Sequence, residues 1–320
     1  MDSITMLSNS LGLPSDALRF SICILAGFPL SFLFQKIPAS SPNTRHLFSI
    51  LTSTFLIITI YTLQAWMHLV VAVVYTFAIT AYLKSKRSAV FVTGLLLLHM
   101  AYIHMTHQIW FPNQLPDSTG TMMVLVMKLS SFAWSINDGH TPMKLTLDQQ
   151  TNAIRTMPAF IELLGFSFFF LGVFVGPAFE FNVYHDFIHE INDFKTNEKS
   201  STRFYSTFLL GVLLLIAHVL LTTNGFDFKS LVEFPDELGF ARRMIHIYLC
   251  ALAFRLQFAG AWKLTECICT TTRIASIPAT STPRTNKPSF TRACNIDIAN
   301  VELAPNVRTL TVNWNKVPLF

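Results

Sequence analysis

The sequence carries little charge for its length. Only 13% of its 320 residues are Asp, Glu, Lys or Arg, whereas 52% are hydrophobic. A soluble domain has about 25% charged residues, because these cover the surface that faces water. Glycine is scarce as well, with 12 residues against 30 Phe, which argues against a tightly turned β-protein. The composition indicates bulky apolar helices whose outer faces contact lipid.

A disulfide framework and a long basic run are also lacking. The five cysteines are an odd number with irregular spacing, so we predict free thiols and no zinc-finger ligand set. The net charge is +5, but no run of Lys and Arg is long enough to follow a phosphate backbone. We therefore predict no nucleic-acid partner, and basic loops that face the cytoplasm.

Long apolar runs predict an all-α, polytopic membrane protein, because backbone groups in hydrocarbon must pair within their own segment. A span needs about 20 mostly apolar residues. The candidate spans are residues 17–34, 46–63, 65–83, 89–109, 121–136, 159–179, 205–222 and 244–268. The run 121–136 is the weakest, since it is short and contains Lys128, and we expect it to be tilted, re-entrant or buried in the bundle.

The loop charges predict a topology. Lys and Arg occur in the loops 35–45 and 84–88, whereas the turn near Gln64 and the loop 110–120 contain neither. Basic loops therefore alternate with neutral ones, which places the N-terminus outside the cytoplasm. The composition also divides the chain into a multi-span bundle (1–269), a Ser/Thr/Pro-rich loop (270–291) and a polar terminal region (292–320).

Histidines within or beside the spans are candidates for function. His104 and His107 share a helix face, but no carboxylate or Cys accompanies them in the sequence. We therefore predict hydrogen bonding between helices or at the interface for these residues and for His99, and no metal site. His218 lies near the centre of its span, where a helix–helix hydrogen bond is the favoured role and a place in a cavity wall is the alternative.

Four segments occur in an order typical of one known family. They are KLSSFAWSINDGH (128–140), GFSFFFLGVFVGPAFEFNVYHDFI (165–188), QFAGAWKLTE (257–266) and NIDIANVELAPNVRTLTVNWN (295–315). In the last segment, Glu302 is followed by residues 303–313 and then by Trp314 and Asn315. With these segments the chain resembles the membrane-bound O-acyltransferase (MBOAT) family, and specifically its fungal lysophospholipid acyltransferase branch.

The resemblance implies a partial MBOAT helical bundle in the bilayer, expected in the endoplasmic reticulum. It implies transfer of a fatty acyl group to a lysophospholipid hydroxyl, with acyl-CoA as co-substrate and no cofactor. Asn315 corresponds to the family's catalytic Asn, whose amide can donate to an oxyanion but cannot act as a base. Our candidates for substrate binding are Lys128, Ser131, Trp134, Asp138, Trp262, Glu302 and Trp314.

The family's general base is a His in a Trp-His-Gly segment beyond the Asn, and the sequence ends at Phe320 without one. Ala299 and Pro318 also depart from the family pattern. From these features we expect residues 292–320 to be an incomplete catalytic region of an inactive chain. The alternative is a non-catalytic membrane protein that binds lipid or a partner. An unrelated transporter or receptor ranks last, because no inverted repeat is seen.

Overall fold

The computed structural model describes residue 6 and residues 15–83, 87–111, 117–141, 145–194, 201–227, 229–230, 239–277 and 289–316. The described residues form helices and no strand, apart from a single antiparallel bridge between Ile277 and Ser289. The helices are α2 (Ser15–Phe34), α3 (Pro42–Ile60), α4 (Leu63–Tyr82), α5 (Ser88–Met105), η1 (Thr106–Trp110), α6 (Thr119–Gly139), α7 (Leu147–Asn152), α8 (Phe160–Ser167), α9 (Phe181–His189), η2 (Asn192–Phe194), α10 (Ser201–Thr223), α12 (Phe240–Thr271), α13 (Ile298–Glu302) and α14 (Val307–Asn313).

Helices long and apolar enough to cross a membrane form where spans were predicted. The described residues contain 5 of them, namely Leu63–Tyr82, Ser88–Trp110, Thr119–Gly139, Thr202–Thr223 and Phe240–Thr271. A shorter apolar helix, Leu18–Phe34, coincides with the first predicted span, and α3 coincides with the second. The all-α, polytopic membrane architecture is therefore confirmed.

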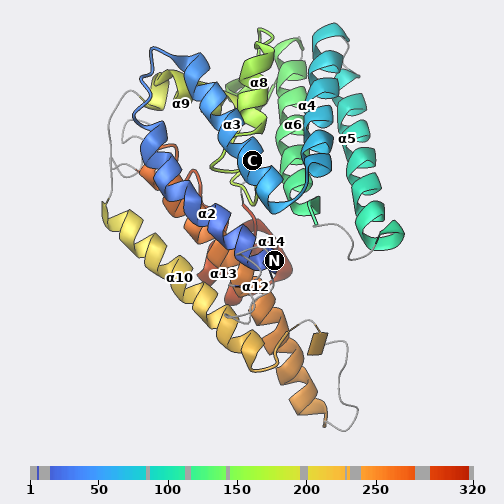
Figure 1. The fold of residues 1–320 in the computed structure, drawn as a ribbon, viewed down its shortest axis with the longest axis vertical. Coiled ribbons are helices and arrows are strands. Elements are labelled where there is room, and N and C mark those ends of the chain that lie inside the picture. The colour runs from blue at the N-terminus through green and yellow to red at the C-terminus, as the bar shows by residue number, and fades with distance from the viewer. Residues whose placement is uncertain are drawn as a thin grey trace.

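The connections of this bundle lie at two opposite ends. Helices α3 to α6 alternate in direction, so that the C-terminal ends of α2 and α4 share one end (Figure 1). Lys84 and Lys86 of the second predicted basic loop lie outside the described residues. Helix α6 was the weakest predicted span, and it is the most buried candidate, with 67% of its apolar window inside the protein. Its burial explains why a helix with a lysine and several serines can lie within an apolar bundle.

The predicted span 159–179 is wrong. Helix α8 ends at Ser167, and residues 168–180 continue as turns and irregular chain. The phenylalanines of this stretch are buried inside the protein instead of facing lipid, and Phe168 and Phe169 are almost completely covered. An apolar run that packs in the core has the same composition as a span, so hydropathy alone could not separate the two.

Side chains from other helices bind carbonyls where α8 ends and this irregular segment, residues 168–180, begins. Ser53 Oγ of α3 donates to the Phe168 carbonyl at 2.6 Å. Lys128 Nζ of α6 donates to the Phe166 carbonyl and, at 3.2 Å, to that of Ser167 at the end of α8. Irregular backbone surrounded by apolar groups is stable only where such partners exist, because each unpaired carbonyl would be costly.

Helices α10 and α12 form a closely packed pair. A Cβ on Gly260 of α12 would lie 2.7 Å from Leu215 Cδ2, and one on Gly211 of α10 would lie 3.1 Å from Leu264 Cδ2. Glycine is therefore needed for this distance of approach, as is common between membrane helices. The outer face of α10 exposes an apolar stripe suited to lipid, consisting of Leu209, Leu213, Ile216 and Leu220.

Two of the histidine predictions and the thiol prediction are confirmed. His99 Nε2 of α5 lies 3.1 Å from His68 Nδ1 of α4, and His218 Nδ1 of α10 donates to the Ala253 carbonyl of α12 at 2.9 Å. Both contacts join neighbouring helices. Each of the five cysteines is a free thiol, namely Cys23, Cys250, Cys267, Cys269 and Cys294.

Candidate functional site

Asn315 lies in a backbone crossing between two parts of the terminal region. The Asp297 amide donates to the Asn313 carbonyl at 3.1 Å, and the Lys316 amide donates to the Asn295 carbonyl at 2.7 Å. Between these two bonds, Asn315 has a left-handed conformation with a φ of 51°. Asn tolerates this conformation better than most residues, so its identity at this position fits the local backbone as well as a chemical role.

An aromatic cluster connects Asn315 to α12. The rings of Trp314 and Trp262 meet edge to face with centroids 5.0 Å apart, and Phe258 flanks both. Trp262 Nε1 donates to the Val175 carbonyl at 3.0 Å, in the middle of the irregular segment. The structure therefore brings three of the sequence-predicted residues, Trp262, Trp314 and Asn315, to one place.

An apolar cavity adjoins this cluster. It lies between α2, α12 and the irregular segment, and its walls include Ile24, Phe170, Phe174, Val175, Gly176, Thr265 and Ile268. Val175 lines the cavity, and its carbonyl accepts the hydrogen bond from Trp262, so the cavity and the aromatic cluster meet at this residue. The cavity wall is largely apolar, and the space inside it is about 20 Å³, so an alkyl chain would have to displace the surrounding side chains to enter.

A second asparagine, Asn295, borders the backbone of the irregular segment. A Cβ on Gly176 would lie 3.3 Å from Asn295 Nδ2, and Gly176 has a φ of 82° that favours glycine. Asn295 is 3% exposed, and no described protein group donates to its buried Oδ1. A buried acceptor in this state needs a water or ligand donor, so Asn295 adds a polar group that the sequence analysis did not select.

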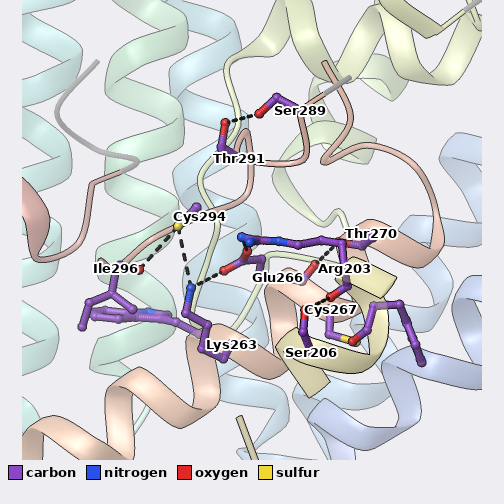
Figure 2. A network of polar contacts seen from close by, with 12 residues as sticks. Arg203, Ser206, Lys263, Glu266, Cys267, Thr270, Ser289, Thr291, Cys294 and Ile296 are labelled. Atoms are coloured by element: carbon purple, nitrogen blue, oxygen red, sulfur yellow. Dashed lines mark hydrogen bonds and ion pairs between the residues drawn. The ribbon is translucent and has the colours of Figure 1, made fainter. Parts of the chain in front are cut away.

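A buried ion-pair network supports the segment that precedes Asn315. Lys263 Nζ donates to Glu266 Oε2 at 2.7 Å and lies 3.7 Å from Cys294 Sγ, while Arg203 of α10 contacts Glu266 Oε1 (Figure 2). The Cys294 thiol in turn donates to the Ile296 carbonyl at 3.4 Å. The network joins α10 and α12 to the chain around Cys294. Asn295, the next residue, accepts the Lys316 amide, so the network holds one of the two segments of the backbone crossing at Asn315.

Glu302, a predicted substrate-binding residue, is occupied by an ion pair. Both its carboxylate oxygens accept from Arg255 of α12 at 2.8 Å, in a bidentate arrangement. Nearby, Asp297 caps α13 by accepting from the Asn300 amide at 3.2 Å. This hydrogen bond lowers the pKa of Asp297. The Glu302 ion pair therefore holds α13 against α12, whereas Asp297 caps the N-terminus of α13.

The predicted residues of α6 form a separate group. Lys128 binds the end of α8, and Ser131 Oγ donates to Glu180 Oε2, where the irregular segment meets α9. Trp134 is exposed, and Asp138 lies in the last turn of α6, so neither belongs to the aromatic cluster. The irregular segment links the two groups, because Lys128 binds the end of α8 just before it, Ser131 binds Glu180 at its end and Trp262 binds its middle.

Comparison with known proteins places this geometry in a family. The family model described as "MBOAT, membrane-bound O-acyltransferase family" matches residues 114–317, well over half of the chain. The chain belongs to the membrane-bound O-acyltransferase family. The matched range contains every residue selected from the sequence, from Lys128 to Asn315.

The sequences of curated relatives align with almost the whole chain. The "Lysophospholipid acyltransferase" of Schizosaccharomyces pombe is 30% identical over 96% of this chain and 62% of its own length. The protein of the same name from Saccharomyces cerevisiae is 28% identical over 98% of this chain and 54% of its own length. A human "Membrane-bound glycerophospholipid O-acyltransferase 2" is 24% identical over 97% of this chain and 63% of its own length. The chain thus spans between half and two thirds of these relatives.

The sequence contains a signal for the ion-pair network, although none of its residues was predicted to form one. Lys263 and Glu266 lie three residues apart in an apolar helix, so they share a face. Charges in such a helix usually face the interior of the bundle and pair there. Their partners Arg203 and Cys294 come from distant parts of the chain, and no spacing rule could have found them.

Proposed function

We propose that this chain carries the acyl-binding part of a lysophospholipid acyltransferase, which uses acyl-CoA and acts in the endoplasmic reticulum membrane. The observation that carries the proposal is the contact of Val175, which lines the apolar cavity, with Trp262, whose ring packs against Trp314 next to Asn315 in a chain of this family. In this arrangement the cavity widens to take up the alkyl chain, while the thioester lies toward the polar crossing.

Asn315 then stabilises the transition state. Attack of a hydroxyl on a thioester develops negative charge on the carbonyl oxygen, and an amide N–H can donate to that oxygen. The hydroxyl must also lose its proton to a base, which an amide cannot provide. Residues 289–316 contain no histidine, so the proposal gives this part of the chain oxyanion stabilisation and substrate orientation only.

Two substitutions separate the chemical role of Asn315 from its backbone role. Asn315→Gly keeps the freedom to adopt a φ of 51° but removes the amide, whereas Asn315→Asp keeps the shape and removes the donor. In a chimera that joins residues 1–316 to the remaining C-terminal part of the Schizosaccharomyces pombe relative, we expect each to lower acyl transfer from radiolabelled acyl-CoA to lysophospholipid by about 10²- to 10³-fold. Asn300→Ala, in the exposed face of α13, is the matched control and should keep the activity of the unmodified chimera.

The outcomes are distinct. Transfer that persists in Asn315→Gly would remove Asn315 from the reaction. A chimera that binds lipid but shows no transfer would contradict the enzymatic proposal and favour the non-catalytic, lipid-binding alternative. A fluorescent fusion that does not co-localise with an endoplasmic reticulum marker would contradict the proposed membrane.

A further inference from the structure

A second group of polar residues lies away from the acyl cavity, between α8 and α9. Glu162 of α8 and His185 and His189 of α9 place one ligand atom each so that all three atoms lie within 4.8 Å of one another. The two imidazole centroids are 4.3 Å apart, since residues four apart share one face of a helix. Two imidazoles and one carboxylate are a ligand set typical of zinc.

Hydrogen bonds orient two of these groups. His189 Nδ1 lies 2.9 Å from the His185 carbonyl, which can only accept, so Nδ1 carries the proton and Nε2 has the free lone pair. Glu162 Oε2 accepts the Ala159 amide at 2.7 Å at the N-terminus of α8. Metal ligands are commonly held in this way by contacts through the atom that does not bind the ion.

A buried histidine nearby provides an independent observation. The ring of His46 in α3 lies 6.5 Å from that of His189, and its Nδ1 bonds the Tyr184 hydroxyl at 2.7 Å. His46 is 1% exposed, and its buried Nε2 has no partner among the described residues. A buried imidazole nitrogen without a partner is costly, and a metal-bound water would satisfy it.

We propose that Glu162, His185 and His189 form a binding site for a divalent transition-metal ion, with zinc as the favoured ion. With zinc–ligand bonds of about 2.0–2.2 Å, the ligand atoms of a tetrahedral site lie about 3.4 Å apart, so modest side-chain rotations close the present cluster. The three residues leave a fourth position for water, whose hydrogen would face His46. Zinc and similar transition-metal ions bind imidazole well, whereas calcium and magnesium prefer oxygen ligands. A set with two imidazoles therefore favours zinc over calcium or magnesium.

The position of the site gives the ion a structural role. Helices α8 and α9 flank the irregular segment, and α9 is held to the start of α3 by Arg45, which donates to the Ile188 carbonyl at 2.8 Å. An ion shared by α8 and α9 would therefore fix both ends of the segment whose middle contacts Trp262. No metal site was predicted from the sequence, because only the cysteines and the histidines of α5 were considered, and Glu162 meets the two histidines only through the packing of α8 and α9.

The test uses the whole 320-residue chain, purified in detergent without an affinity tag and freed of metal. We expect one equivalent of Co²⁺ to bind with the visible absorption of a low-symmetry site, and Zn²⁺ to displace it. Glu162→Gln and His189→Ala should each weaken binding by at least about tenfold. His104→Ala removes a histidine of α5 outside the cluster and should leave binding unchanged.

Glu162→Gln protects the test against misfolding, because a glutamine oxygen can still accept the Ala159 amide and preserve the cap. Circular dichroism of each metal-free variant checks the helical content. A second readout is the melting temperature, which Zn²⁺ should raise in the unmodified chain and in His104→Ala but not in His189→Ala. The proposal is overturned if the chain binds no stoichiometric ion, or if Glu162→Gln and His189→Ala bind it as tightly as the unmodified chain.

Discussion

Two buried lysines of this protein are stabilised in opposite ways. Lys128 of α6 is 3% exposed and meets only neutral groups, namely the carbonyls at the end of α8 and the face of the Phe166 ring, 4.6 Å away. Lys263 of α12 is 6% exposed and meets the Glu266 carboxylate. The first cation satisfies a helix end, whereas the second belongs to an ion pair. Removing Lys128 therefore leaves carbonyl groups without a donor, whereas removing Glu266 leaves a buried cation without its counter-ion.

The largest effect is expected where an acid is removed from the ion-pair network. Glu266→Ala deletes the carboxylate that both Lys263 and Arg203 contact, and the Lys263 side chain remains buried. Breaking one partner out of a buried pair costs about 3–5 kcal/mol, because an uncompensated charge stays in the interior. The free energy of unfolding, measured by denaturant titration in mixed micelles, should fall by this amount.

A second glutamate serves as the control for this change. Glu190 also binds an arginine, Arg45, at 2.6 Å, but its own side chain is 39% exposed. Arg45 keeps carbonyl partners at Ile37 and Ile188 without it. Glu190→Ala should therefore cost only about 1 kcal/mol. Equal losses for the two substitutions would refute the idea that burial of the network sets the cost.

An intermediate effect is expected at the other lysine. Lys128→Met keeps a long apolar stem but leaves the carbonyls of Phe166 and Ser167 without this donor. Unsatisfied buried acceptors cost about 1–3 kcal/mol, and no charge remains behind, so the loss should be smaller than that for Glu266→Ala. Unfolding in the same micelles checks this order.

The control for the lysine is Lys36→Met. Lys36 is exposed in the α2–α3 connection, and such surface changes usually stay within about 0.5 kcal/mol. Hydrogen exchange of residues 168–180 offers a second measurement, since loss of the carbonyl contacts should speed exchange there and not in α10. A Lys128→Met protein as unstable as Glu266→Ala would show that the lysine charge, and not its donor capacity, matters.

The sequence was sufficient for most of the helices and insufficient for the chain between them. Spans such as Leu63–Tyr82 were predicted because their apolar length matches the bilayer, and nothing in their packing alters that signal. The irregular segment failed because its phenylalanines are equally apolar whether they face lipid or fill a core. Its stability depends on donors from Ser53, Lys128 and Trp262, which lie far away in sequence.

The place of the site could likewise be predicted only in part. The order of Trp314 and Asn315 after Glu302 located the terminal region, and the structure joins that pair to Trp262. The substrate-binding roles of Lys128 and Glu302 remain predictions, although both side chains already bind protein groups. Sequence reasoning selects polar residues in apolar surroundings, but it cannot distinguish those that bind substrate from those that bind a helix end or an arginine.

The smallest expected effect extends the comparison to an acid near the surface. Asp297→Ala removes the cap of α13 and should cost about 1 kcal/mol or less, since the side chain is only partly buried. The Asn300 amide lowers the pKa of Asp297 in the folded protein, so this stabilisation is present above the unfolded pKa of about 3.9 and is lost as the pH falls through the folded pKa. Unfolding measured from pH 7 down to pH 3 should show the difference between the two proteins shrinking. Asp297→Asn keeps a capping oxygen without the charge, and if it reproduces the full pH dependence of the unmodified chain, the carboxylate is not its source.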